Sequence, residues 1–176
     1  FFPSNALSTA RAYWQHAGRI LCSRAAEDWL ANRKLAQPNP RLERELCSRL
    51  AGWSGASAEN ISLHPSGMAA IYAAFQIVTS RRPGKRTMMF GFPYTDTLKI
   101  LQKFGAGDIF LRGDEADLKR LGELLEKEAI AGIFCEVPSN PLLQTPDLPA
   151  LAKLAHSRCV PVVVDDTIGT SFNVNV

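Results

Sequence analysis

The sequence contains no apolar run of about 18 residues, so it offers no segment that would cross a membrane as a helix. It also lacks Cys-x-x-Cys spacing and any cluster of histidines. Its four cysteines and three histidines stand far apart, at Cys22, Cys47, Cys135, Cys159, His16, His64 and His156. This spacing excludes the common metal-ligand patterns, and we expect no metal site and reduced, structural cysteines.

The chain also lacks a strong charge of either sign, since its net charge is +3. The only basic cluster is formed by Arg81, Arg82, Lys85 and Arg86, which we interpret as a solvated turn. A nucleic-acid binder needs a more continuous basic face, so we expect no nucleic acid as partner. Neither Gly-x-Gly-x-x-Gly nor Gly-Lys-Ser/Thr occurs, so a nucleotide is not indicated. The beginning of the chain shows no secretory signal, and we expect a cytoplasmic protein.

The 176 residues are 46% apolar and 21% charged, an ordinary composition for one domain with a buried core. Good helix formers fill residues 8–17 and 25–35, and the prolines at 38 and 40 mark a turn. Residues 42–50 follow as an amphipathic helix that we expect to stop at Gly52. We therefore predict an N-terminal helical arm over residues 1–60.

From residue 61 onward the pattern alternates between strands and helices. The predicted strands, about five, are residues 61–64, 87–92, 108–111, 131–135 and 162–165, and the predicted helices are 68–78, 95–104, 114–125 and 147–157. This alternation predicts a parallel α/β sheet with right-handed crossovers, forming one domain over residues 61–176. After Thr167 no helix is predicted to cover the last strand, so we expect the chain to be part of a longer polypeptide.

The last predicted strand is a run of three valines that leads directly into Asp165 and Asp166. Such a run is typical of a strand buried on both faces of a parallel sheet. The acids then lie at its carboxyl end, where open α/β sheets bind ligands. The alternative is that one carboxylate caps the next turn and the other is solvated.

A turn of small residues, Ser66-Gly67-Met68, joins the strand predicted at 61–64 to the following helix. Backbone N–H groups at a helix N-terminus form a ready site for an anion, and a serine side chain adds one donor. The alternative is that Ser66 is an ordinary N-cap.

Two further strand ends carry candidate ligand-binding side chains, Tyr94 and Asn140. Tyr94 offers an aromatic face for stacking, or it packs at the rim of the core. Asn140 offers an amide for a hydroxyl or carboxylate, or it serves only turn chemistry before Pro141. An anion turn, an aromatic ring, an amide and the Asp165 carboxylate together suit a phosphorylated pyridine, because a carboxylate keeps a ring nitrogen protonated.

These same stretches resemble the Cys/Met-metabolism family of pyridoxal phosphate enzymes, and in particular its fungal-type cystathionine gamma-synthase branch. The resemblance is specific from residue 61 onward and looser before it. It rests on Ser66-Gly67-Met68-Ala69-Ala70-Ile71, on Phe90-Gly91-Phe92-Pro93-Tyr94-Thr95-Asp96-Thr97-Leu98-Lys99, on Glu136-Val137-Pro138-Ser139-Asn140-Pro141-Leu142-Leu143, on Val162-Val163-Val164-Asp165-Asp166-Thr167, and on Trp14-Gln15-His16 and Ser23-Arg24.

The resemblance implies part of the large domain of a fold-type I pyridoxal phosphate transferase, preceded by the helical arm. It implies that the Gly67 and Met68 amides, with Ser66, hold the cofactor phosphate. It also implies that Tyr94 stacks on the ring and assists as a base. The remaining implied contacts are Asn140 near the ring hydroxyl and the substrate carboxylate, Asp165 with Thr167 at the ring nitrogen, and Arg24 reaching the phosphate of a neighbouring subunit in a homodimer or homotetramer. Asp166 receives no role.

The Schiff-base lysine that the resemblance requires is absent from these 176 residues, as is the small C-terminal domain. Lysines at positions 99, 103, 119, 127 and 153 fall on predicted helices and do not match its motif.

The implied activity is gamma-replacement on an O-acyl-homoserine-type amino acid, with cysteine or a carbon nucleophile as the second substrate. Elimination by a gamma- or beta-lyase of the same family stays open, and so does a truncated, non-catalytic paralogue. A Mg²⁺ site at Asp165 and Asp166 for phosphoryl transfer is the weakest alternative, because no phosphate-binding lysine or threonine is positioned with them.

Overall fold

The computed structural model describes residues 3–34 and 37–174. The chain divides into two compact units, Phe1–Ala70 and Ile71–Val176, and each is described by itself. The sequence predicts the boundary at residue 60, ten residues earlier. The turn predicted to bind an anion, Ser66-Gly67-Met68, therefore lies in the N-terminal unit and not in the α/β unit.

The N-terminal unit is helical. It contains η1 (Ser4–Ala6), α1 (Leu7–His16), α2 (Ser23–Leu30), α3 (Pro40–Ser54) and η2 (Ala58–Asn60). The second helix ends earlier than predicted, and residue 35, its predicted last residue, lies outside the described residues. Helix α3 is longer than predicted, because the Asn39 side chain accepts hydrogen bonds from the first-turn amides and Pro40 takes the first helical position. The predicted stop at Gly52 is wrong, since α3 continues to Ser54 and is capped by Gly55, which has a φ of +70°.

The strand predicted over residues 61–64 is also wrong. The segment has no regular secondary structure, and residues 62–64 are exposed. The alternation of Ile61 and Leu63 indicates a strand only if a neighbouring strand is present, and the described part of the N-terminal unit contains none. The sheet therefore has four strands among the described residues instead of about five.

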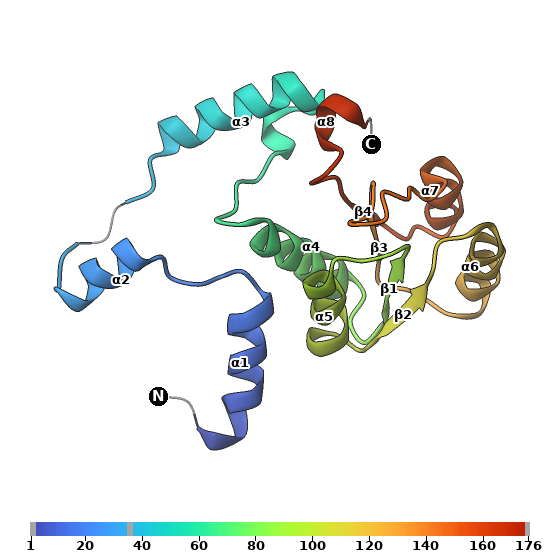
Figure 1. Ribbon diagram of the computed structural model, residues 1–176, viewed down its shortest axis with the longest axis horizontal. Coiled ribbons are helices and arrows are strands. Elements are labelled where there is room, and N and C mark those ends of the chain that lie inside the picture. The colour runs from blue at the N-terminus through green and yellow to red at the C-terminus, as the bar shows by residue number, and fades with distance from the viewer. Residues whose placement is uncertain (1–2, 35–36, 175–176) are drawn as a thin grey trace. The chain divides into compact units, whose positions relative to one another are not determined.

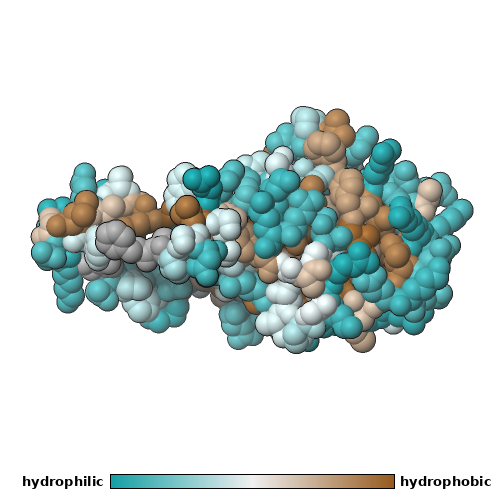
Figure 2. Space-filling view, turned by 90° about the horizontal axis from the view of Figure 1, so that it is seen from below, coloured by the Kyte–Doolittle hydropathy of each residue, from teal (hydrophilic) through white to brown (hydrophobic). Residues whose placement is uncertain are grey.

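The N-terminal unit leaves many large apolar side chains at its surface (Figure 2). Trp14 is 65% exposed, Trp29 66% and Leu30 76%, whereas the buried apolar side chains of this unit are small. The helices of this unit thus keep much of their apolar surface uncovered within the unit.

The C-terminal unit holds the sheet. Its elements are most of α4 (Gly67–Arg81), then β1 (Thr87–Phe90), α5 (Thr95–Phe104), β2 (Asp108–Leu111), α6 (Glu115–Lys127), β3 (Ile133–Glu136), α7 (Leu148–Ser157), β4 (Val162–Asp165) and the short α8 (Thr170–Asn173). All neighbouring strands are parallel, in the order β2-β1-β3-β4. The predicted parallel α/β architecture is confirmed, and it is consistent with part of a fold-type I large domain. Helix α8 follows β4 where no helix was predicted.

Helices cover both faces of the sheet (Figure 1). Met88, Phe90, Ile133 and Cys135 belong to a buried cluster with the apolar side chains of α6 and α7. Successive strand residues point to opposite faces, so Met89 and Phe134 face the side that α4 and α5 cover. Burial on two faces explains why β1 and β3 are apolar throughout most of their length.

The strand order creates a switch point between β1 and β3. The chain leaves β1 through α5 to reach β2 on one side, and it leaves β3 through α7 to reach β4 on the other side. Ligands of open α/β sheets bind where connections diverge in this way, at the carboxyl ends of the strands. The candidate site is therefore the set of loops after β1, β3 and β4.

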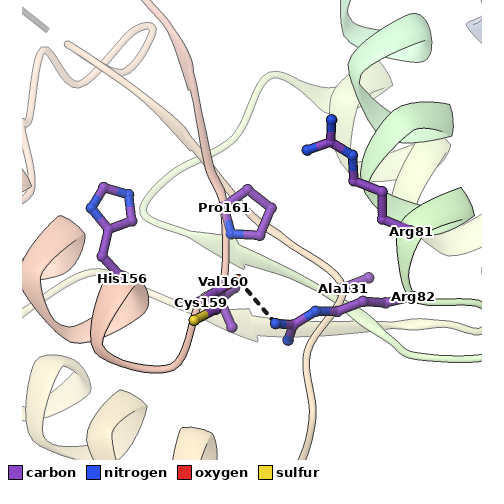
Figure 3. Close-up of a pocket in the computed structure, with 7 residues that line it drawn as sticks. All are labelled: Arg81, Arg82, Ala131, His156, Cys159, Val160 and Pro161. Carbon is purple, nitrogen blue, oxygen red and sulfur yellow. Dashed lines mark hydrogen bonds between the residues drawn. The ribbon is translucent and has the colours of Figure 1, made fainter.

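The amino ends of β3 and β4 are closed by Arg82, at the end of α4 (Figure 3). Its guanidinium donates hydrogen bonds to the carbonyl oxygens of Ile130 at 2.9 Å, Cys159 at 2.9 Å and Arg158 at 3.3 Å. A cavity of about 350 Å³ opens beside it, lined also by Arg81 and His156. This cavity lies at the opposite end of the strands from the switch point.

Candidate functional site

The carboxylate of Asp165 ends β4 and is held in place by Thr167. The Thr167 amide donates to Oδ1 at 3.1 Å, and the Thr167 hydroxyl donates to the same oxygen. Asp165 is half-buried and Thr167 is exposed. Only one carboxylate oxygen is engaged by these bonds, so the group keeps acceptor capacity at the carboxyl end of the sheet.

The loop after β3 is a closed turn that presents Asn140. The Ser139 amide donates a hydrogen bond to the Gln144 carbonyl at 2.9 Å, and the Ser139 carbonyl accepts one from the Leu143 amide at 2.7 Å. The Ser139 hydroxyl accepts a further bond from the Gln144 amide at 3.2 Å, and Ser139 is 2% exposed. A buried serine thus anchors the turn while Asn140 beside it is exposed.

The loop after β1 presents Tyr94, which is 45% exposed and precedes the first residue of α5. Gly91 begins this loop with a φ of +94°, a conformation that favours glycine. A Cβ atom at Gly113, in the loop after β2, would lie 2.8 Å from the Gly91 Cα atom. This close approach fixes the path of the chain toward Tyr94.

Glu136 is the buried acid of the site. It is the last residue of β3, it pairs in register with Asp165 of β4, and it is only 7% exposed. Burial raises the pKa of Glu136 above 4.5, and the nearby Asp165 charge adds to this shift. The backbone N–H groups of Asn140 and Tyr94 oppose the shift by favouring the charged form. Glu136 is thus the group that both loops approach.

Cys135 precedes Glu136 and points to the opposite face of the sheet. Burial, followed by the charge of Asp165, raises the pKa of the Cys135 thiol to about 12. A thiol with this pKa is not a nucleophile at neutral pH. All four cysteines are free, with Cys47 and Cys135 buried and Cys22 and Cys159 exposed.

The raised pKa of Glu136 predicts a dependence of stability on pH. Between 4.5 and the raised value the folded state binds more protons than the unfolded state, so the stabilisation is complete below 4.5 and is lost as pH rises through the folded pKa. Glu136→Gln cannot lose a proton. Urea unfolding at a series of pH values should therefore show its free energy of unfolding improving relative to wild type as pH rises.

Glu128→Gln is the matched control for this pH series. The Arg86 guanidinium, bonded to Glu128 at 2.6 and 2.8 Å, lowers the pKa of that carboxyl. The stabilisation by Glu128 is present above its ordinary pKa and is lost as pH falls, the opposite direction. Parallel curves for wild type and Glu136→Gln would contradict the burial of a titrating carboxylate at this position.

The anion turn of the N-terminal unit begins helix α4. The Ser66 hydroxyl accepts from the Ala69 amide at 3.1 Å, as an N-cap does, and donates to the Gly18 carbonyl at 3.1 Å. Gly18 has a φ of +63°, and a Cβ atom there would lie 2.5 Å from Ser66 Oγ. Ser66 therefore serves as an N-cap, while the Gly67 amide and the partly exposed Met68 follow it in the first turn. Arg24 is exposed on α2.

The structure places three of the predicted site residues together and the others apart from them. Tyr94, Asn140 and Asp165 come to the carboxyl end of one sheet, while Ser66, Gly67, Met68 and Arg24 belong to the other unit. Sequence reasoning gave no role to Glu136. A signal for it was available, because an acid stands between Cys135 and Val137 in an otherwise apolar stretch.

The family model described as "Cys/Met metabolism PLP-dependent enzyme" matches residues 33–176. The chain belongs to this family.

Three curated relatives show the range of the family. A cystathionine gamma-synthase of Neurospora crassa is 44% identical over 76% of this chain and 23% of its own length. An L-2-amino-4-chloropent-4-enoate dechlorinase/desaturase of Streptantibioticus cattleyicolor is 37% identical over 97% of this chain and 37% of its own length. An alanine racemase of Aspergillus violaceofuscus is 33% identical over 99% of this chain and 37% of its own length. The chain thus spans between about a quarter and two fifths of these relatives.

The residues at the carboxyl end fit the ring of pyridoxal phosphate, the cofactor of this family. The site offers a carboxylate with free acceptor capacity, an exposed aromatic ring and an exposed amide. The five lysines at 99, 103, 119, 127 and 153 lie on α5, α6 and α7, as predicted. In the described ranges no three His, Cys, Asp or Glu side chains gather as metal ligands, and no helix there is long and apolar enough to span a membrane.

Proposed function

We propose that this chain contributes the cofactor-facing part of a pyridoxal phosphate-dependent enzyme that performs gamma-replacement on an O-acyl-homoserine-type amino acid. The observation that carries the proposal is the convergence of Asp165, Asn140 and Tyr94 around the switch point. The relative from Neurospora crassa, named cystathionine gamma-synthase, supports the choice of reaction.

Each ring-facing residue has its own part in this proposal. The Asp165 carboxylate, oriented by Thr167, holds a proton on the ring nitrogen, because an anion next to that nitrogen favours its protonated form. Tyr94 stacks on the ring and takes up a proton from the substrate. Asn140 donates to the ring hydroxyl and to the substrate carboxylate. When bound, pyridoxal phosphate supplies the electron sink that makes an amino acid acidic next to its amino group.

The N-terminal unit contributes the phosphate contacts in this proposal. The amides of Gly67 and Met68 lie in the first turn of α4, where the helix dipole favours an anion. Ser66 completes the turn as its N-cap, and Arg24 reaches the phosphate of a neighbouring subunit in a homodimer or homotetramer. The fold-type I class and the division into arm and cofactor domain are part of the same proposal.

An assay of the full-length protein with O-acetylhomoserine tests the reaction. With pyridoxal phosphate and cysteine we expect cystathionine, detected by mass spectrometry, and little keto acid. Keto acid without a cysteine adduct would contradict gamma-replacement.

Elimination or racemisation is the second candidate, because the relatives named dechlorinase/desaturase and alanine racemase cover 97% and 99% of this chain. The same preparation, incubated with L-alanine and analysed by chiral chromatography, distinguishes them. D-alanine formed faster than cystathionine would favour the racemase, and keto acid from O-acetylhomoserine would favour the lyase.

A further inference from the structure

Glu136 has a buried carboxylate for which the proposed chemistry has no use. It is 7% exposed at the end of β3, and its Oε2 atom is buried without a hydrogen-bond partner among the described residues. Burying such an oxygen costs free energy, so natural proteins keep one only for a reason beyond stability.

The surroundings of the carboxylate indicate what it does. Glu136 lines a small cavity together with residues of the loops after β1 and β3, and the backbone N–H groups of Tyr94 and Asn140 favour its charged form. Tyr94 belongs to the loop after β1 and Asn140 to the loop after β3, so the Glu136 side chain lies between the loops on the two sides of the switch point. This cavity of about 40 Å³ is lined by Gly91 of the loop after β1 and by Gln144 of the loop after β3, so the acid lies against both loops.

Other groups near this point do not provide the same link. The hydrogen bonds of Ser139 go to Gln144 and Leu143, which belong to the same loop after β3. Asp165 is engaged by Thr167 on its own strand end. Among these three polar groups, Glu136 alone lines the cavity shared by the loops after β1 and β3.

We propose that Glu136 is a positioning residue that fixes the loops of Tyr94 and Asn140 to each other, so that the aromatic ring and the amide approach one ligand from set directions. Its role toward the cofactor rests on the proposed function, whereas its role in fixing the loops does not.

Hydrogen exchange of the cofactor-free, full-length protein tests the loop contact. Glu136→Ala should accelerate exchange about tenfold in peptides covering residues 91–97 and 137–144, because the carboxylate that lies between the two loops is lost. Glu136→Gln keeps an acceptor oxygen in the same place and should restore most of the protection. Glu128→Ala, which breaks a surface ion pair of the same unit, should change neither peptide. Wild-type exchange in both loops of Glu136→Ala, or equal acceleration throughout the C-terminal unit, would overturn the proposal.

Binding of pyridoxal 5′-phosphate, followed by quenching of protein fluorescence, tests the link to the cofactor. Glu136→Ala should raise the Kd about tenfold and Glu136→Gln less than about threefold. An unchanged Kd in Glu136→Ala would overturn the link. If wild-type protein does not bind pyridoxal phosphate, the proposed function fails, and the exchange experiment still decides whether Glu136 fixes the loops.

Discussion

Asp165→Asn is expected to lower kcat/KM for gamma-replacement by about 100-fold, the largest effect on activity that the proposed site predicts. The amide carries no charge, so it no longer holds a proton on the ring nitrogen. Loss of a hydrogen bond to a charged group costs up to about 3 kcal/mol, and each 1.36 kcal/mol corresponds to about tenfold in rate. Steady-state kinetics with O-acetylhomoserine and cysteine measure the effect.

Asp166→Asn is the matched control for this substitution. Asp166 adjoins Asp165 and is also half-buried, and its side chain has no role in the proposed site. In the Asp165→Asn variant, Thr167 can still donate to the oxygen of the new side-chain amide, so the strand end keeps its shape. Activity of Asp165→Asn equal to that of Asp166→Asn would contradict the assignment of the ring-nitrogen partner.

Phe90→Ala is expected to lower the free energy of unfolding by about 3–5 kcal/mol, a large share of the roughly 5–15 kcal/mol of a typical domain. Phe90 is 0% exposed in β1, an inner strand of the sheet, and packs in the cluster below α6 and α7. Its ring also lies against Gly113, since a Cβ atom there would lie 3.5 Å from Phe90 Cδ1. The substitution thus removes contacts from the core and from the loop after β2.

Phe110→Ala on β2 provides the comparison, because it removes the same ring from an edge strand where the side chain is 44% exposed. Half-burial predicts a loss below about 1.5 kcal/mol in urea unfolding. Equal losses for the two variants would show that the inner strand is not packed as described.

The sequence predicts most of the sheet because its strands and helices differ clearly in pattern. The valines of β4 and the apolar run of β3 lie where expected, and Gly105 follows the last residue of α5 as predicted. The expectation that β4 is buried on both faces is wrong, because β4 is an edge strand and its residues are only half-buried. The strand at 61–64 fails because alternation in four residues has no meaning without a partner strand. Helix α3 outlasts Gly52, since glycine is tolerated within a helix when a left-handed stop such as Gly55 follows.

The site is predictable only in part. Strand ends are visible in the sequence, so Tyr94, Asn140 and Asp165 are found by position and by resemblance. The pairing of Glu136 with Asp165 depends on the order and register of β3 and β4, which arise from contacts far apart in the chain. The bond from Ser66 to Gly18 spans 48 positions and has no sequence signal beyond the glycine itself.

The hydrogen bonds that Arg82 makes at the amino ends of β3 and β4 bear on how the loops of such a chain can vary in sequence. One guanidinium joins the end of α4 to the segments that enter both strands, so this end of the sheet is held together at a distance from the loops after β1, β3 and β4. Mutations that reshape those loops can then accumulate without weakening the hydrogen bonds of Arg82. A scaffold whose stabilising contacts and variable loops lie at opposite ends of the sheet can support different reactions. Its relatives include proteins named as a synthase, a dechlorinase/desaturase and a racemase.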